Sequence, residues 1–404
     1  MRNILDRLTF ILTHHILLIF AITGSFLSFS LHPGSIGDFM KGCGILFLIN
    51  LITGHYRFSD FNKGHIIFFA VFLLVLGINF TVPLEMVHKR SFQNFLYVPG
   101  MVMAVDCLAL KLEKHGTGFF SVFCASVLLV VLAAQLIVHL FFENKGDYGM
   151  YGNLHHMGLF SSVTLPVVAY FFAMFKGWPR IILVIAGLSD FYLLWESSSR
   201  ISWLGFFFGV MLTGVLFFTI KNFGKAIAVL LIAGYSTAYI SGFSPLENRV
   251  HDLLSNWRQE ERFVLTSDAL NMLNDSSVKE WITGHGIGSY RFYNQKYTTK
   301  NMTFGFPHNV FLQILFENGI IGFIAIFGGF SLLLFALWRT YHKLKEKPDI
   351  YFLVTIFSVF WISFIHCALT KSIYSKYIIY PLSLIIGISF ALIRKGNNRA
   401  EIEG

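Results

Sequence analysis

The sequence predicts an all-α integral membrane protein with about twelve transmembrane helices and one large loop on the outer side of the membrane. Hydrophobic residues make up 55% of the 404 residues and charged residues only 13%, whereas soluble domains carry roughly a quarter charged residues. The apolar residues form continuous runs, which span a bilayer as helices, since membrane strands would alternate. This composition excludes a cytosolic enzyme, a disordered tail protein and a disulfide scaffold.

The apolar runs are each close to the ~20 residues that cross a bilayer as a helix. We expect no cleavable signal peptide, because the first run continues directly into further spans. The predicted spans are 8–29, 39–53, 65–83, 95–112, 118–142, 155–175, 179–196, 201–220, 224–241, 309–337, 350–370 and 376–394.

Lysines and arginines predict the orientation, because positive loops stay in the cytoplasm. If the N-terminus, with Arg2 and Arg7, is cytoplasmic, most of the positive charges of the short loops fall on the same side. We therefore expect both termini in the cytoplasm. The net charge of +9 then reports topology, and we predict no nucleic-acid partner.

The long segment 242–308 follows the ninth span and is predicted to face outward. Its charged residues alternate with Leu, Trp and Phe at helical spacing from about 246 to 273, which predicts amphipathic helices lying against the membrane. The chain thus divides into three parts. Residues 1–241 hold nine spans, 242–308 form the loop, and 309–404 hold three spans and a cytoplasmic tail.

Several kinds of chemistry lack a sequence signal. No GxxxxGK[ST] loop, GxGxxG strand–helix fingerprint or HExxH occurs, so ATP-driven work, dinucleotide redox and zinc hydrolysis are unsupported. The four cysteines fall in or beside spans and form no CxxC pair, which predicts core thiols. We expect no metal and no cofactor.

Two arginines at the predicted outer face are candidate anion ligands. Arg200 lies in a short turn between Trp195 and Trp203, and Arg262 precedes the amphipathic stretch. A guanidinium fork suits a phosphate or diphosphate. The alternatives stay open: Arg200 as an interfacial arginine between tryptophans, and Arg262 as part of a solvated face.

His308 is a candidate general base. Pro307 before it and Asn309 after it mark the beginning of a helix. An imidazole at a helix N-terminus feels the positive end of the dipole, which favours its neutral form, and neutral imidazole is what a general base needs at pH 7. A histidine that merely caps a span remains the alternative.

These three features in this order resemble the O-antigen ligase and polymerase superfamily of bacterial envelope enzymes. Arg200-Ile-Ser-Trp-Leu204 fits the R-x3-L pattern of that family. His308-Asn309, nine residues and Gly319-Ile-Ile-Gly322 fit its H-[NSQ]-x9-G-x2-[GTV] pattern. The run from Arg262 to Gly284, Gly286 and Gly288 resembles its arginine, amphipathic helix and GxGxG.

Two further points of the resemblance are weaker. Relatives often carry a proline shortly before the GxGxG, and here the stretch reads Glu280-Trp-Ile-Thr283. The stretch 151–157, with His155 and His156, is similar to a histidine-bearing stretch of some ligases, although adjacent histidines at a membrane boundary are more often structural.

The resemblance implies a GT-C-like fold and glycosyl transfer. O-antigen would pass from undecaprenyl diphosphate to the lipid A core at the periplasmic face of the inner membrane, without metal or nucleotide. Arg200 and Arg262 would bind the diphosphate, and His308 would be the general base. The remaining expected substrate-binding residues are Asn309, Gly284, Gly286, Gly288, His155, His156 and Arg258. Membrane lipids surround the protein.

Two other functions compete with ligation. An O-antigen polymerase uses the same donor, but polymerases commonly have two sizeable outer loops and only one is predicted here. A polytopic transporter would place ionisable groups near the membrane midplane. Asp106, His139, Asp190 and Glu317 lie in or near spans, yet the candidate chemical groups gather at one face, which favours catalysis.

Overall fold

The computed structural model describes residues 61–115, 154–197, 199–217, 261–297, 305–344 and 346–403, with short pieces between 42 and 54 and between 129 and 137. Over these residues the chain forms helices and no β-strand. The predicted spans 8–29 and 224–241, most of 39–53 and 118–142, and the first part of the outer loop, 242–260, lie outside the described residues, as does His139.

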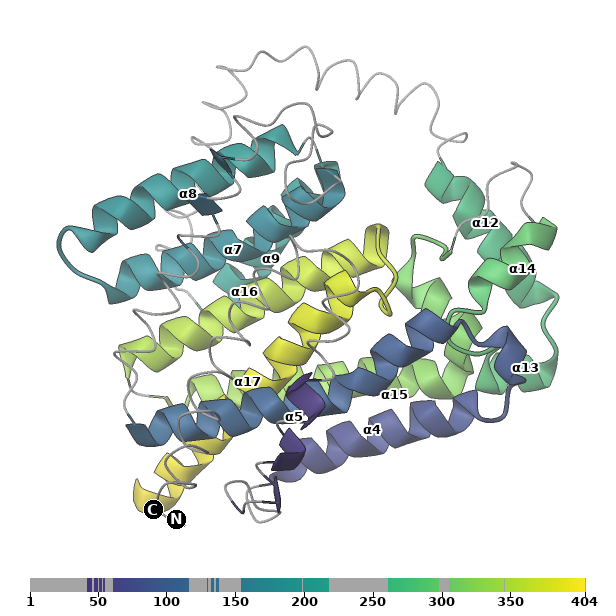
Figure 1. The fold of residues 1–404 in the computed structure, drawn as a ribbon, viewed down its shortest axis with the longest axis horizontal. Coiled ribbons are helices and arrows are strands. Elements are labelled where there is room, and N and C mark those ends of the chain that lie inside the picture. Colours follow the sequence, from purple (N-terminus) through teal and green to yellow (C-terminus); the bar gives the residue numbers. More distant parts are fainter. Residues whose placement is uncertain are drawn as a thin grey trace.

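Each predicted span that falls within the described ranges coincides with a helix. The helices are shown in Figure 1. In chain order they are α4 (Lys63–Asn79), the 3-10 turn η3 (Leu84–Met86), α5 (Lys89–His115), α7 (Leu154–Met174), α8 (Pro179–Glu196), α9 (Arg200–Phe217), α12 (Glu261–Asn274), α13 (Val278–Thr283), α14 (Tyr290–Tyr297), α15 (Val310–Tyr341), α16 (Lys347–Leu369) and α17 (Lys376–Glu403).

Three helices are long and apolar enough to cross a membrane. They are α7 over His156–Met174, α15 and α16, and two shorter apolar helices cover Lys63–Asn79 and Ile201–Leu216. These helices support a helical membrane protein, and the full set of twelve spans stays a prediction.

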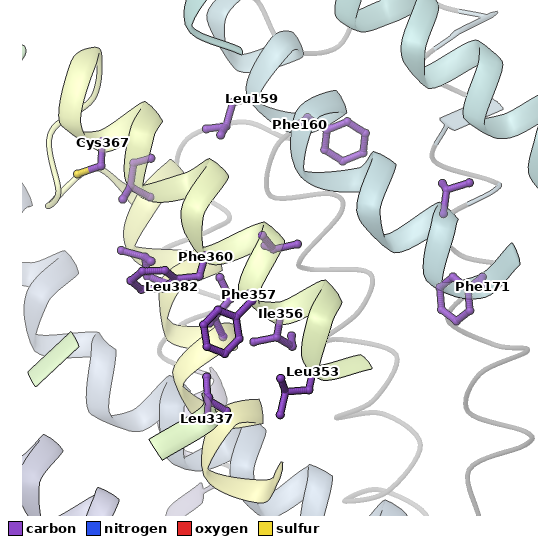
Figure 2. Close-up of a cluster of buried hydrophobic side chains, with 14 of the residues drawn as sticks. Leu159, Phe160, Phe171, Leu337, Leu353, Ile356, Phe357, Phe360, Cys367 and Leu382 are labelled. Carbon is purple, nitrogen blue, oxygen red and sulfur yellow. The ribbon is translucent and has the colours of Figure 1, made fainter. Parts of the chain in front are cut away.

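Helix α16 is the central helix of the described bundle. In its most apolar window 61% of the residues are buried, against 11% for α15, and it packs against α7, α9, α15 and α17. Figure 2 shows Phe357 and Phe360 of α16 beside Leu382 of α17, with Phe160 of α7 in the same cluster. This core holds together the helices that carry the candidate site.

Small residues let α9 approach α16 closely. A Cβ atom added at Gly209 would lie 3.2 Å from the backbone oxygen of Ser358 and 3.2 Å from the backbone nitrogen of Ile362. Gly205, one turn earlier, faces His366 in the same way. Glycines four residues apart are a common device where membrane helices meet, because association there depends on close packing.

One face of α8 is apolar and exposed. Ile181, Ile185 and Leu188 follow each other at helical spacing and lie open, whereas Leu183 and Leu193 are buried. An apolar stripe of this kind is favourable against lipid tails but not against water. The amphipathicity that a soluble helix would show is therefore absent from α8.

The helices of the predicted outer loop, α12, α13 and α14, gather at one end of the bundle (Figure 1). The predicted amphipathic stretch is helical where it is described, and Ala269, Met272 and Leu273 of α12 pack with Tyr290 of α14 and Phe316 of α15. These residues of α12 therefore lie on protein, whereas Phe263 and Leu270 of the same helix are exposed. Contact of the loop with the membrane surface stays a prediction.

Buried acids in the bundle have structural partners. Asp106 of α5 accepts hydrogen bonds from Arg394 of α17 at 2.7 and 3.3 Å, and its Oδ2 lies 3.1 Å from His65 Nε2 of α4. Thr164 donates to Asp190. Cys43, Cys107 and Cys367 are buried in the bundle, which confirms the predicted core positions of these three cysteines.

Candidate functional site

Helices α7 and α9 begin at the same end of the molecule. A Cβ atom at Gly158, in the first turns of α7, would overlap the Ser202 hydroxyl of α9 and lie 2.7 Å from Ser197 Oγ. Ser199 caps α9, since its Oγ accepts the backbone N–H of Ser202 at 3.4 Å, and it also accepts the Ser202 hydroxyl at 2.8 Å. Serine is favoured at this position because it satisfies donors that the helix leaves open.

Helix α15 begins at this end too. Phe311 in its first turn meets Phe364 near the end of α16 in an edge contact of 6.0 Å between ring centroids, and His366 of α16 faces Gly205 of α9. The N-termini of α7, α9 and α15 therefore share one end of the bundle. Helix N-termini carry partial positive charge and attract anions.

Arg200 and Arg262 both stand at helix beginnings. Arg200 is the first residue of α9, and Arg262 is the second residue of α12. Helix α12 packs against α15 and α14. The side chains of the two arginines lie outside the described part of the structure, so their meeting with His308 stays a prediction.

His308 directly precedes the N-cap of α15. Asn309 is the N-cap, and its Oδ1 accepts hydrogen bonds from the backbone N–H groups of Phe311 and Leu312 at 3.0 and 3.2 Å. The predicted helix start is confirmed. Because Asn309 Oδ1 serves the helix, only its amide nitrogen is left for the predicted contact with substrate.

The backbone of His308 is in the left-handed region, with φ of 52°. For a residue with a side chain this conformation costs roughly 1–2 kcal/mol, and it persists only where the surroundings impose it. The half-buried ring lies 4.5 Å from the Phe306 ring, between centroids, and Pro307 is buried. His308 is therefore held in one direction by its neighbours.

The glycine-rich loop docks on a break in α15. Gly319 interrupts α15 with φ of 63° and ψ of −174°. At this break the backbone N–H of His285 donates to the Phe316 carbonyl at 3.0 Å, and that of Gly286 donates to the Glu317 carbonyl at 2.8 Å. The first glycine of the histidine motif is thus the break to which the loop is bound.

Close approach of backbone to backbone explains the glycines. Gly284, Gly286 and Gly288 have φ values of 76°, 98° and 75°, which side chains rarely adopt. A Cβ atom at Gly284 would lie 2.5 Å from the backbone nitrogen of Asn318. The three glycines are buried against protein, and their contact with substrate stays a prediction.

A short helix leads into this loop where relatives often carry a proline. In α13 the Ser277 Oγ accepts from the Glu280 N–H at 3.3 Å, and Glu280 Oε2 accepts from the Ser277 N–H at 2.7 Å. This reciprocal capping box fixes the start of the helix and so fixes the entry of the chain into the loop without proline.

His285 clamps the loop to α15. Its ring stacks on Phe316 at 4.1 Å with an interplanar angle of 9°, and its Nδ1 donates to the Phe316 carbonyl at 3.1 Å. Nε2 lies 3.5 Å from Glu280 Oε1. Burial lowers the pKa of His285, while the Phe316 carbonyl and the Glu280 carboxylate act in the opposite direction.

A buried polar network joins four parts of the chain. Asn79 at the end of α4 accepts from the Ile287 N–H of the loop at 2.7 Å and donates to Asn318 Oδ1 at 3.3 Å. Asn318 Nδ2 donates to the Tyr374 hydroxyl. Sequence reasoning missed these residues, although an amide inside an apolar span is a usable signal.

Glu317 lies one turn after Gln313 on the same side of α15. Gln313 Nε2 donates to Glu317 Oε2 at 3.3 Å and to Ser372 Oγ at 2.7 Å. The structure thus pairs this acid, which the sequence places inside a span, with Gln313. The carboxyl group therefore belongs to the bonding between α15 and the connection from α16 to α17.

A lysine that sequence reasoning left out of the site lies at the same end. Lys371 Nζ donates to His156 Nε2 of α7 at 3.0 Å, and burial lowers the pKa of Lys371 to about 8. His156 was a predicted site residue. The side chain of His155 lies outside the described residues.

Arg258 lies outside the described residues. Arg291 of α14 donates to His88 Nε2 at 2.6 Å, and burial, with the charges of Arg291 and Arg90, lowers the pKa of His88. Within the described ranges, no three His, Cys, Asp or Glu residues are grouped so that they could hold a metal ion.

Comparison with known proteins gives one family match. A family model described as O-antigen ligase matches residues 181–327. This segment contains α9, the outer-loop helices α12 to α14, and α15 as far as the break and the glycines beyond it. No curated protein matches the chain.

Proposed function

Because the chain belongs to the O-antigen ligase superfamily, we propose that it is an O-antigen ligase. It transfers O-antigen polysaccharide from undecaprenyl diphosphate to the lipid A core oligosaccharide at the periplasmic face of the inner membrane. One observation carries the proposal: within the matched segment, the helix starts bearing Arg200 and the His308–Asn309 motif lie at one end of the bundle, where the outer-loop helices pack.

Arg200 and Arg262 bind the diphosphate of the donor in this proposal. The bond between the first sugar and the diphosphate breaks, and negative charge grows on the departing phosphate oxygen. Preorganised guanidinium groups stabilise that charge more strongly than water does. The N-terminus of α9 adds to the stabilisation, because its dipole points its positive end toward the same charge.

His308 accepts the proton of the acceptor hydroxyl. The hydroxyl oxygen forms a bond to the anomeric carbon as the diphosphate leaves, so the anomeric centre inverts and undecaprenyl diphosphate is released. General-base catalysis contributes ~10²–10⁴-fold. The fixed left-handed backbone of His308 supports this role, because a base must be held within hydrogen-bond reach of the proton that it removes.

The test is transfer by the purified protein. A polyprenyl-diphosphate glycan is offered together with lipid A core and, in a second reaction, with another lipid-linked glycan, each with and without EDTA. Product on the core that persists with EDTA is expected. Product only on the second lipid-linked glycan would identify a polymerase, and loss of product with EDTA would contradict the metal-independent mechanism.

A further inference from the structure

Lys371 lies on the short connection between α16 and α17, at the end of the bundle where α7, α9 and α15 begin. Its backbone N–H donates to the His366 carbonyl at 3.1 Å and so closes the end of α16. Its ammonium turns away to α7 and donates to His156 Nε2 at 3.0 Å. The charge is thus directed to the α7 N-terminus rather than to the open carbonyls of α16.

This ammonium has no acidic partner among the described residues. The ion pairs formed there involve His65 and Arg394 with Asp106, Lys395 with Asp349, and His285 with Glu280. Lys371 is partly buried, and this burial lowers its pKa to about 8. A cation that is partly withdrawn from water without a counter-ion is unfavourable, and a bound anion would reduce that cost.

The connection that carries Lys371 is rigidly held. Gln313 of α15 donates to Ser372 Oγ at 2.7 Å and accepts from the Ile373 N–H at 3.3 Å. Asn94 of α5 donates to the Tyr374 carbonyl at 3.0 Å. These bonds hold the residues directly after Lys371, so the position of the cation is set before any ligand arrives.

The same bonds place Lys371 beside the histidine motif. Gln313 is in the first turn of α15, which begins just after His308 and Asn309. His156 is in the first turn of α7, next to the turn that leads into Arg200. An ammonium has three donors, and His156 takes one of those of Lys371.

We propose that Lys371, oriented by His156, is a further ligand of the donor's diphosphate. This assignment rests on the proposed function, because it names a residue of the same site. The ligand chemistry is a phosphate oxygen, and two lipids could supply it: the polyprenyl diphosphate donor or a phosphorylated lipid A acceptor. The position between the starts of α7 and α15 favours the donor.

The experiment measures binding by the full-length protein in nanodiscs of zwitterionic lipid. Undecaprenyl diphosphate and lipid A core are titrated separately against the natural protein and against Lys371→Met, Lys371→Gln and Lys371→Arg. Lys296→Met is the matched control, since Lys296 is exposed on outer-loop helix α14. Gel filtration and a melting curve establish that each variant is folded.

We expect Lys371→Met to raise the Kd for undecaprenyl diphosphate by roughly 10- to 100-fold, the effect of losing one hydrogen bond to a charged group. Lys371→Arg should stay within a few-fold of the natural protein, and Lys296→Met should match it. An unchanged Kd in either folded neutral variant overturns the proposal, and so does a loss confined to lipid A core.

A transfer assay on the natural protein separates this inference from the proposed function. If the natural protein joins glycan to core and the neutral variants bind donor normally, the inference fails and the ligase assignment stands. If it transfers nothing to core, the ligase assignment fails. The Kd comparison then still decides whether Lys371 binds the diphosphate lipid.

Discussion

His308 combines an imidazole with a backbone conformation that few non-glycine residues adopt. The left-handed φ of 52° is imposed by a buried proline before it and a helix cap after it. Such fixed conformations are found where a side chain must be aimed accurately. His308 is therefore suited to accept a proton from a hydroxyl group, a step whose rate depends on the distance between the imidazole and that hydroxyl.

His308→Ala should lower the transfer rate by at least ~10²-fold while the protein still folds, because alanine keeps the backbone but removes the base. Single-turnover transfer at equal membrane abundance measures the loss. His342→Ala, at the other end of the same helix, is the control and should retain the natural rate. Natural activity of His308→Ala would remove this histidine from the mechanism.

Gly319 is the residue at which the outer loop and α15 depend on each other. A Cβ atom there would collide with the Ile282 carbonyl and lie 2.6 Å from the Gly284 nitrogen, in a backbone with φ of 63°. Neither the loop nor the helix can move aside without breaking the buried bonds of His285 and Gly286.

Gly319→Ala should lower the melting temperature and expose the 284–288 loop to protease, since alanine at positive φ costs more than ~1 kcal/mol. Gly328→Ala in the same helix is the matched control. A Cβ atom there meets nothing within 4 Å, and alanine favours helix by up to ~1 kcal/mol. Equal melting temperatures for the two variants would contradict the close contact between the 284–288 loop and the break in α15.

At the scale of elements, both neutral and charged groups join the helices. At the end with α12 to α14, the neutral amides of Asn79 and Asn318 join α4, the glycine loop and α15. The other end uses charge, with Asp106 of α5 bound by Arg394 of α17. Charge is costly to bury, and removal of one partner leaves the other unpaired.

Arg394→Met should therefore destabilise the protein by ~3–5 kcal/mol, since it leaves a buried carboxylate without its bidentate partner. Lys395→Met, at the next residue, breaks the more exposed pair with Asp349 and should cost only ~0–1 kcal/mol. Denaturation in detergent followed by tryptophan fluorescence compares them. A loss as small for Arg394→Met as for Lys395→Met would show that the buried pair is unimportant.

The positions of the helices could be predicted from sequence, whereas the contacts between helices could not. Pro307 and Asn309 predict the start of α15, because capping is a local signal. The contacts between Asn79 and Asn318 and between His156 and Lys371 join residues 239 and 215 positions apart. No periodicity or spacing relates residues so distant, and only the folded bundle brings them together.

The glycines show the other limit of sequence reasoning. The resemblance predicts that these glycines bind substrate, but the space at Gly284 is filled by the backbone of α15. A glycine signals close approach without saying what approaches. Lys371 cannot be singled out from sequence for a similar reason, since a lysine at the end of a span usually marks a membrane interface.

For the whole molecule, the positive charges predict that the end with α12 to α14 faces outward. Lys296→Cys on α14 and Lys347→Cys at the start of α16 are exposed positions, predicted to lie on opposite sides of the membrane. In a background without native cysteines, an impermeant thiol reagent should label position 296 in spheroplasts and position 347 only after lysis. The reverse pattern would invert the topology.

The glycine loop is bound to the break in α15 by the Gly286 N–H and the His285 ring, and to α4 by the Asn79 side chain. A loop held by three contacts is not suited to open and close over a bound substrate. We therefore expect the lipid-linked glycan to enter laterally between helices. The glycosylated product should also leave without movement of the glycine loop.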